Sequence, residues 1–219
     1  LYPTPDQLAA LRGVMSDGRP PYADFGVLNG IGQRLAKFSE VDAQVMMPDG
    51  SLITRRVSGP SSHAGWQDNW SFYSAAMVSL GACGIGPLDL YARGIRNLNN
   101  YFPGRWPLIM STDMVVRSEQ WAKLRDRFDR TTPDGYMPNR PWGYILSASA
   151  FGVRDAPLRD WWLNSFVLPN AVTGNTGGAQ RLMAELEGTT EVGGLLALAD
   201  NRRSNDRPPR RAERTKSPT

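Results

Sequence analysis

The chain has 219 residues, of which 41% are hydrophobic and 10% aromatic, which is enough for one sizeable core and therefore one main domain. No stretch approaches 18 consecutive apolar residues and the N-terminus lacks the pattern of a signal peptide, so we expect a soluble, intracellular protein, cytoplasmic or nuclear, without membrane contact. The single Cys83 excludes an internal disulfide, and with the single His63 it cannot form a zinc site, so we expect no metal and no cofactor.

The net charge of +4 is concentrated at the C-terminus. Residues 201–219 hold seven basic and two acidic side chains, whereas the preceding 200 residues hold eighteen basic and nineteen acidic ones. This near-neutral body gives no electrostatic reason to expect a nucleic-acid-binding face, whereas the tail does. The basic residues of the tail are Arg202, Arg203, Arg207, Arg210, Arg211, Arg214 and Lys216.

The first quarter of the chain carries signals for one helix and one hairpin. Thr4-Pro5-Asp6-Gln7 has the pattern of a helix N-cap, a proline at the first helical position and a capping-box partner. Ala43–Met47 and Ser51–Val57 flank Pro48-Asp49-Gly50, a turn of the kind that joins paired strands. We therefore predict a short first helix and one small β-hairpin near residues 43–57.

From Ser62 onward the apolar residues follow helical spacing. A continuous stripe with Ser61 or Ser62 as its cap predicts the main core helix, and further helices follow from about Pro87, Trp106, Pro141 and Pro157. The helix from Trp106 has a stripe that also passes through Arg117, at a spacing like that of a short coiled coil. The residues predicted for the core are Trp66, Trp70, Tyr73, Met77 and Trp121.

These elements predict a mainly α fold, an irregular helical array with one small β-hairpin and a disordered basic tail. Residues 1–168 form the helical domain in this interpretation. Residues 169–200 form a flexible connector with short peripheral helices, because they are rich in Gly, Asn and Thr at their start. Residues 201–219 are predicted to be disordered, since their only apolar side chain is Ala212.

The sequence offers few candidates for chemistry. Asp113 and Arg117 lie four residues apart on one side of a predicted helix, which favours a structural ion pair over a contact with a partner. Residues 81–86 are rich in glycine but follow a helix, whereas nucleotide-binding loops follow a strand. An enzyme acting through Asp113, Glu119 or His63 stays open as a third alternative.

A set of aromatic, glycine and proline spacings over about residues 40–170 resembles the Gag-like N-terminal regions of retroelement polyproteins that are abundant in large protist genomes. The matching residues are Gly59-Pro60, Trp66, Trp70-Ser71-Phe72, Leu88-Asp89-Leu90-Tyr91, Tyr101-Phe102-Pro103-Gly104-Arg105-Trp106, Asp113, Arg117-Ser118-Glu119, Arg125, Arg140-Pro141-Trp142 and Asp160-Trp161-Trp162.

The resemblance implies a non-catalytic structural protein of a retrotransposon. Its helical domain would pack against copies of itself or against partners, while its basic segment contacts RNA or another single-stranded nucleic acid. The family supplies no catalytic residue to carry over. A host scaffold or an RNA-processing adaptor, with a protein-binding body and an RNA-binding tail, is the alternative.

Overall fold

The computed structural model describes residues 2–25, 40–46, 52–153 and 156–172, together with residues 177 and 180. Helices dominate this part of the chain, so the prediction of a mainly α protein is confirmed. The elements are α1 (Pro5–Ser16), β1 (Glu40–Met46), β2 (Leu52–Ser58), α2 (His63–Ser79), α3 (Ile85–Tyr101), α4 (Trp106–Val115), η2 (Val116–Gln120), α5 (Trp121–Thr131), α6 (Trp142–Ser149), α7 (Arg159–Trp162), η3 (Leu163–Val167) and α8 (Leu168–Val172).

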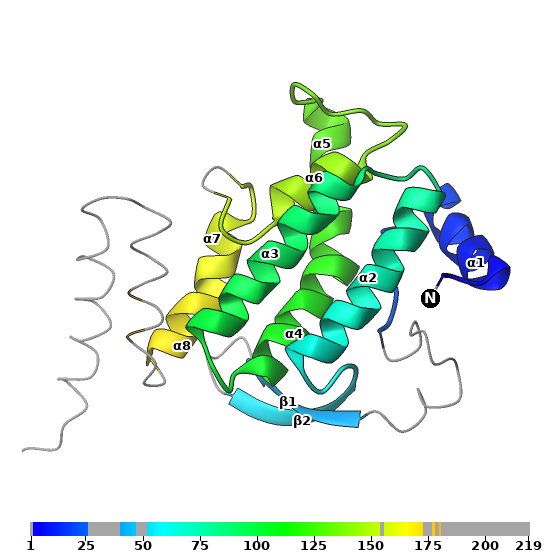
Figure 1. Cartoon of the computed structure of the whole chain (residues 1–219). Helices are drawn as coiled ribbons and strands as arrows, with labels where there is room; N and C mark the ends of the chain where they lie inside the picture. The colour runs from blue at the N-terminus through cyan, green and yellow to red at the C-terminus, as the bar shows by residue number, and fades with distance from the viewer. Residues whose placement is uncertain are drawn as a thin grey trace, which may run out of the picture.

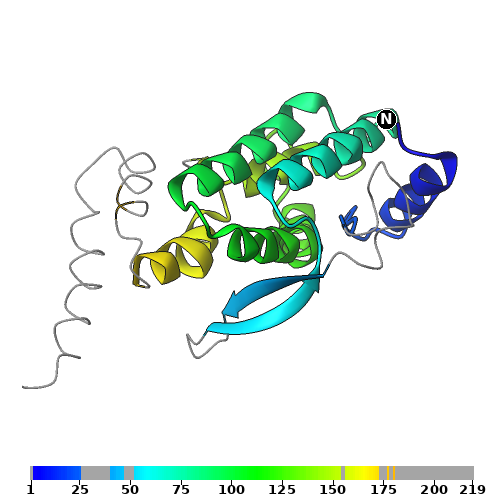
Figure 2. The ribbon, with the colours of Figure 1, turned by 60° about the horizontal axis from the view of Figure 1, so that its bottom comes forward.

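The helices pack around one core, with α2 and α3 side by side and α3 also against α4 and α6 (Figure 1). The strands β1 and β2 pair in antiparallel register, from Glu40 opposite Ser58 to Met46 opposite Leu52. They lie at one end of the helical body, where β1 contacts α4 (Figure 2). The turn predicted at Pro48-Asp49-Gly50 lies outside the described residues.

Side-chain caps mark the N-termini of α1 and α2. The Thr4 hydroxyl accepts from the Gln7 backbone N–H at 3.3 Å, and the Gln7 side chain accepts from the Thr4 N–H at 2.9 Å, so the predicted capping box is confirmed. Ser62 caps α2 by accepting from the Gly65 N–H. Helix α3 begins at Ile85, two residues before the predicted start at Pro87.

The helix predicted from Trp106 contains a π-helical turn that the sequence pattern does not predict. Helices α4 and α5 continue one another through η2, where each turn holds more residues than in an α-helix. This wider turn brings Val116, Arg117 and Gln120 into the interior next to Trp121. The stripe is therefore not that of a regular coiled coil, because η2 rotates the residues after it relative to those before it.

The C-terminal helical segment extends past the predicted end of the domain at residue 168. Helices α7 and α8 are joined by a second π-helical turn, η3, and α8 ends at Val172. Asn170, in α8, is buried at 1% exposure. The remaining connector, apart from residues 177 and 180, and the tail lie outside the described residues. None of the helices in the described part of the chain has the length and apolar character of a membrane span.

Candidate functional site

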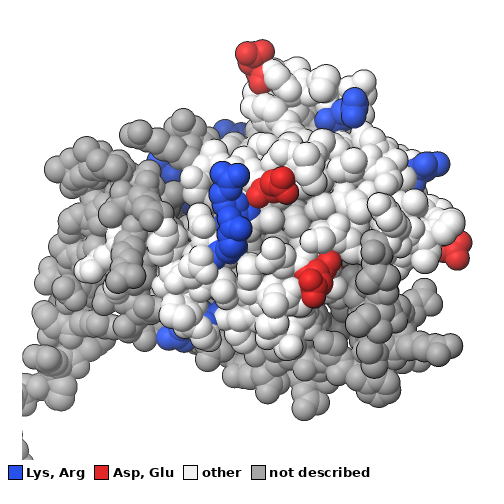
Figure 3. Space-filling model, viewed as in Figure 1, with Lys and Arg blue, Asp and Glu red and all other residues white. Residues whose placement is uncertain are grey.

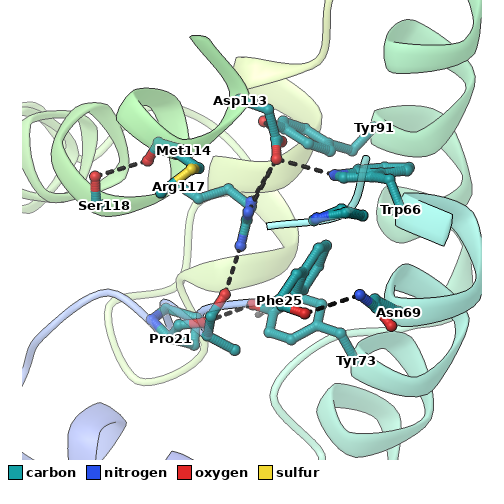
Figure 4. Close-up of polar contacts among 12 residues, drawn as sticks. Pro21, Phe25, Trp66, Asn69, Tyr73, Tyr91, Asp113, Met114, Arg117 and Ser118 are labelled. Carbon is teal, nitrogen blue, oxygen red and sulfur yellow. Dashed lines mark hydrogen bonds and ion pairs between the residues drawn. The ribbon is translucent and has the colours of Figure 1, made fainter. Parts of the chain in front are cut away.

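The most elaborate polar cluster in the described residues surrounds the carboxylate of Asp113, at 0% exposure in α4 (Figure 4). Its Oδ2 atom accepts from Trp66 Nε1 at 3.0 Å and from Arg117 Nε at 2.9 Å, and Arg117 Nη2 lies at 2.9 Å from the same atom. Its Oδ1 atom accepts from the Tyr91 hydroxyl at 2.9 Å. Four donors from three helical segments thus converge on one buried carboxylate.

Arg117 connects this carboxylate to the N-terminal segment. Its guanidinium donates through Nη1 to the Ala23 carbonyl at 2.8 Å and lies over the Phe25 ring, 4.1 Å from the ring centroid. Burial is the largest single influence on the pKa of Arg117 and lowers it. The charge and the hydrogen bond of Asp113, with smaller contributions from Tyr91 and Tyr22, together raise the pKa above its ordinary value. The guanidinium therefore stays charged inside the core, and Asp113 neutralises it.

Residues 21–25, which we call the N-terminal strap, cross the bundle next to this cluster. The Tyr73 hydroxyl donates to the Pro21 carbonyl at 2.8 Å, and the Asn69 amide donates to the Phe25 carbonyl at 2.9 Å (Figure 4). The Phe25 ring packs against the rings of Trp66, Trp70 and Tyr73. Side chains of α2 and η2 therefore satisfy backbone carbonyls of a segment that has no regular structure of its own.

The aromatic stripe of α2 faces this interior. Trp66 stacks on Trp70 at 5.0 Å between ring centroids, and Trp70 stacks on Tyr91 of α3, also at 5.0 Å. The structure buries all five residues that the sequence analysis assigns to the core, namely Trp66, Trp70, Tyr73, Met77 and Trp121. Burial raises the pKa of Tyr73, and both burial and the nearby Asp113 raise that of Tyr91. These phenols are consequently neutral hydrogen-bond donors.

Of the other two residues of the enzyme alternative, Glu119 lies away from this cluster and His63 lies at its edge, against the Trp66 ring. Glu119 is on the surface and pairs with Lys123 at 4.0 Å, so the structure does not bring it to Asp113. His63 stacks on Trp66 and contacts the edge of Trp106. It lines a surface hollow of about 270 Å³ between α2 and α3, together with Asp89, Arg93 and Arg96. Burial, and then the positive Arg96, lower the pKa of His63.

The sequence does not reveal several members of the cluster, because they come from distant positions. Tyr91 belongs to the apolar stripe of α3 and carries no signal that its hydroxyl meets a carboxylate 22 residues later. The strap contributes the backbone carbonyls of Pro21, Ala23 and Phe25. Every residue has a backbone carbonyl, so the sequence does not show which ones accept these hydrogen bonds. Within residues 2–25, 40–46, 52–153 and 156–172, no group of three or more metal-ligating side chains occurs.

Comparisons with protein-family models, with curated proteins and with solved structures find no match to this chain.

Proposed function

We propose that this chain is a non-catalytic assembly protein, with a helical body that associates with further copies and a basic tail that binds RNA, as the resemblance to Gag-like regions implies. The separation of charge between the tail and the body carries the proposal. Residues 201–219 hold seven cations and three prolines in nineteen positions, and the other 200 residues are close to neutral. Such a composition suits contact with a phosphate backbone that does not depend on the base sequence.

The buried cluster supports a structural role for the body. Asp113 and Arg117 would be the natural centre for chemistry, since they are the buried charged pair among the described residues. Trp66, Tyr91 and Arg117 itself occupy both carboxylate oxygens of Asp113. A carboxylate whose acceptor sites are taken by protein donors holds elements together and is poorly placed to accept a proton from a substrate.

Association of the body would multiply the weak affinity of one tail. A single tail with four to six phosphate contacts should bind single-stranded RNA with a slope of log affinity against log salt of roughly −3 to −4. Linking several tails through associated bodies raises the effective concentration of the free ones on the same strand. Assembly and RNA binding would then reinforce each other.

The tail is tested on the full-length chain by replacing its seven Arg and Lys residues with Gln. A second chain with the same tail residues in shuffled order is the matched control, because it keeps charge and composition. We expect the Gln chain to lose at least about tenfold in affinity for a labelled U20 strand in filter binding at near-physiological salt, and the shuffled chain to retain its affinity. Unchanged affinity of the Gln chain would refute the role of the tail.

Association is tested by size-exclusion chromatography with light scattering, with and without the same strand. The Gag-like function predicts a mass that rises with protein concentration and rises further with RNA. A monomer mass at every protein concentration, and a complex of only one chain per strand with RNA, would overturn the assembly role and favour the RNA-processing adaptor. Circular dichroism of all three chains checks that the helical body is unchanged.

A further inference from the structure

A second surface hollow, of about 240 Å³, lies where the ends of two helices meet a loop. Helix α1, the turn between α2 and α3, helix α5 and the loop before α6 all contribute to its wall. Arg12, Arg125 and Arg140 line it, and none of the residues that line it is acidic. We call it the arginine hollow.

Backbone carbonyls hold two of these arginines in place. Arg125 Nη1 donates to the Gly18 carbonyl at 2.6 Å, and Arg140 Nη2 donates to the Gly81 carbonyl at 2.9 Å. Gly18 and Gly81 have φ angles of 75° and 65° and close the last turns of α1 and α2. The fold itself therefore orders these two guanidinium groups, and a ligand need not supply that ordering energy.

The negative C-terminal ends of α1 and α2 balance only part of the positive charge of the three arginines in the hollow. Each helix C-terminus carries a partial charge of about −0.5, so the ends of α1 and α2 together balance about one arginine. Asp129, outside the hollow, pairs with Arg125 at 3.5 Å and balances another. An excess of about one positive charge therefore remains. Arg12 and Arg140 are both exposed. A guanidinium group has five N–H donors, so each of them has donors left for a ligand.

The hollow beside His63 provides an internal comparison. Basic side chains gather over α3 on that face, with an acidic side chain next to them (Figure 3). Arg93 and Arg96 line the His63 hollow, but so does Asp89, which offsets part of their charge. The two hollows are similar in volume and differ in the presence of a carboxylate.

Apolar side chains also line the arginine hollow. Met15, Leu80 and Trp142 line it, and the Arg125 guanidinium lies over the Trp142 ring at 5.3 Å from the centroid. A phosphate group accepts paired hydrogen bonds from the N–H groups of a guanidinium. A base packs against apolar side chains or stacks on the plane of an arginine. A nucleotide carries both chemical groups, whereas inorganic phosphate or a simple carboxylate uses the arginines alone.

We propose that the arginine hollow binds one nucleotide of single-stranded RNA, with the phosphate at Arg12 and Arg140 and the base against the apolar side chains that line the hollow. The inference rests on the proposed function and gives the body its own point of contact with the strand that the tail holds. Near-neutral net charge of the body does not exclude this contact, because three arginines and no acidic residue line this hollow.

The test compares two double variants of the full-length chain, R12Q/R140Q in the arginine hollow and R93Q/R96Q in the His63 hollow. Each removes two positive charges from exposed positions. R12Q/R140Q should lower the affinity for labelled U20 about five- to tenfold at low salt and reduce the salt slope by about 1. R93Q/R96Q should change the affinity less than twofold. An equal loss in both variants would mean diffuse attraction and would overturn the site.

A local reporter separates a bound nucleotide from long-range attraction. Trp142 lines the arginine hollow, whereas the indole N–H of Trp66 donates to the buried Asp113. The Trp142 indole N–H signal in NMR spectra is therefore the local probe, and that of Trp66 is a reference for the core. We expect U20 to shift the Trp142 signal and leave that of Trp66 unchanged. A shift with uridine monophosphate as well would show that one free nucleotide suffices, whereas a shift with U20 alone would show that the site needs a strand. No shift of the Trp142 signal with either ligand would overturn the proposal.

The variant whose seven tail Arg and Lys residues are replaced by Gln separates a failure of this inference from a failure of the proposed function. If that chain loses affinity while R12Q/R140Q does not, the tail function stands and the arginine hollow is refuted. If R12Q/R140Q loses affinity while the neutralised tail does not, the site stands and the tail function fails. Thermal unfolding checks the fold of each variant. Should R12Q/R140Q unfold, the single R12Q on exposed α1 carries the test, with an expected two- to threefold loss.

Discussion

The stability of the core around Asp113 depends on the pairing of its carboxylate with Arg117. A buried ion pair contributes little net stability, because removing two charges from water costs about as much as their attraction returns. Removing one partner is costly, because it leaves the other charge buried and uncompensated. Arg117 at 1% exposure and Asp113 at 0% are in that situation.

We predict that R117M destabilises the protein by about 3–5 kcal/mol, and that the double variant D113N/R117M is less destabilised. The asparagine is neutral, and its oxygen can accept from Trp66. Its amide can donate to the Tyr91 hydroxyl, which is able to accept as well as donate. Urea unfolding followed by circular dichroism measures both variants. A double variant less stable than the single one would contradict this account of the cluster.

His63 gives the stability a dependence on pH. Its pKa in the folded protein lies below the ordinary value of 6.5, first because of burial and then because of Arg96. The unfolded chain therefore binds the proton more readily, and stability falls as pH drops below about 6.5 towards the lowered folded pKa.

The H63N variant should lose this part of the pH dependence. We expect the free energy of unfolding of the unmodified chain to rise between pH 5 and pH 7 by more than that of H63N. Urea unfolding at both pH values gives the two differences, and subtracting them removes contributions from other groups. Equal rises would show that His63 has the same pKa in both states.

At the scale of elements, α3 crosses the loop after α6 at very close range. A Cβ atom added at Gly94 would lie 2.7 Å from the Phe151 carbonyl oxygen and 2.9 Å from its nitrogen. Both neighbours are backbone atoms and cannot rotate away. Gly94 therefore sets the distance between α3 and this loop, and with it the packing of α3 against α6.

We predict that G94A destabilises the protein by about 1–3 kcal/mol, because the backbones must separate. Gly86, in the first turn of the same helix, has open space at its Cβ position. G86A is thus the matched control and should be neutral or stabilising by up to about 1 kcal/mol, since alanine favours the helix. The midpoints of thermal unfolding compare the two. Similar effects would mean that helix propensity alone operates at Gly94.

Local sequence patterns predict the helix start at Thr4. They do not predict structure that depends on contacts between residues far apart in the sequence. Thr4 and Gln7 form the capping box that their spacing predicts, because its hydrogen bonds join residues three apart. The π-helical turn η2 has no such signal. It places Arg117 within reach of both Asp113 and the strap, and the strap is 94 residues away in the sequence. A local reading of Trp106 to Phe128 predicts one regular helix instead.

At the scale of the whole molecule, averages over the chain conceal how charges are arranged. The net charge of the body indicates no basic surface, yet Arg12, Arg125 and Arg140 line one hollow. Arg12 lies far from the other two in the sequence, and the three meet where the ends of α1 and α2, helix α5 and the loop before α6 form one hollow. The spacing of four between Asp113 and Arg117 indicates their pairing, whereas no sequence pattern connects these three arginines.

The N-terminal strap has a consequence for the order of events during synthesis. Phe25 and the carbonyl of Ala23 leave the ribosome first, but Arg117, which binds that carbonyl, is made 94 residues later. At 5–20 residues per second the strap waits roughly 5 to 20 seconds for this partner. Once Tyr73 has been made, the rings of Phe25, Trp66, Trp70 and Tyr73 still lack Arg117, whose guanidinium lies over the Phe25 ring in the folded protein. We expect the nascent chain to expose these aromatic rings to chaperones and to neighbouring nascent chains during that time.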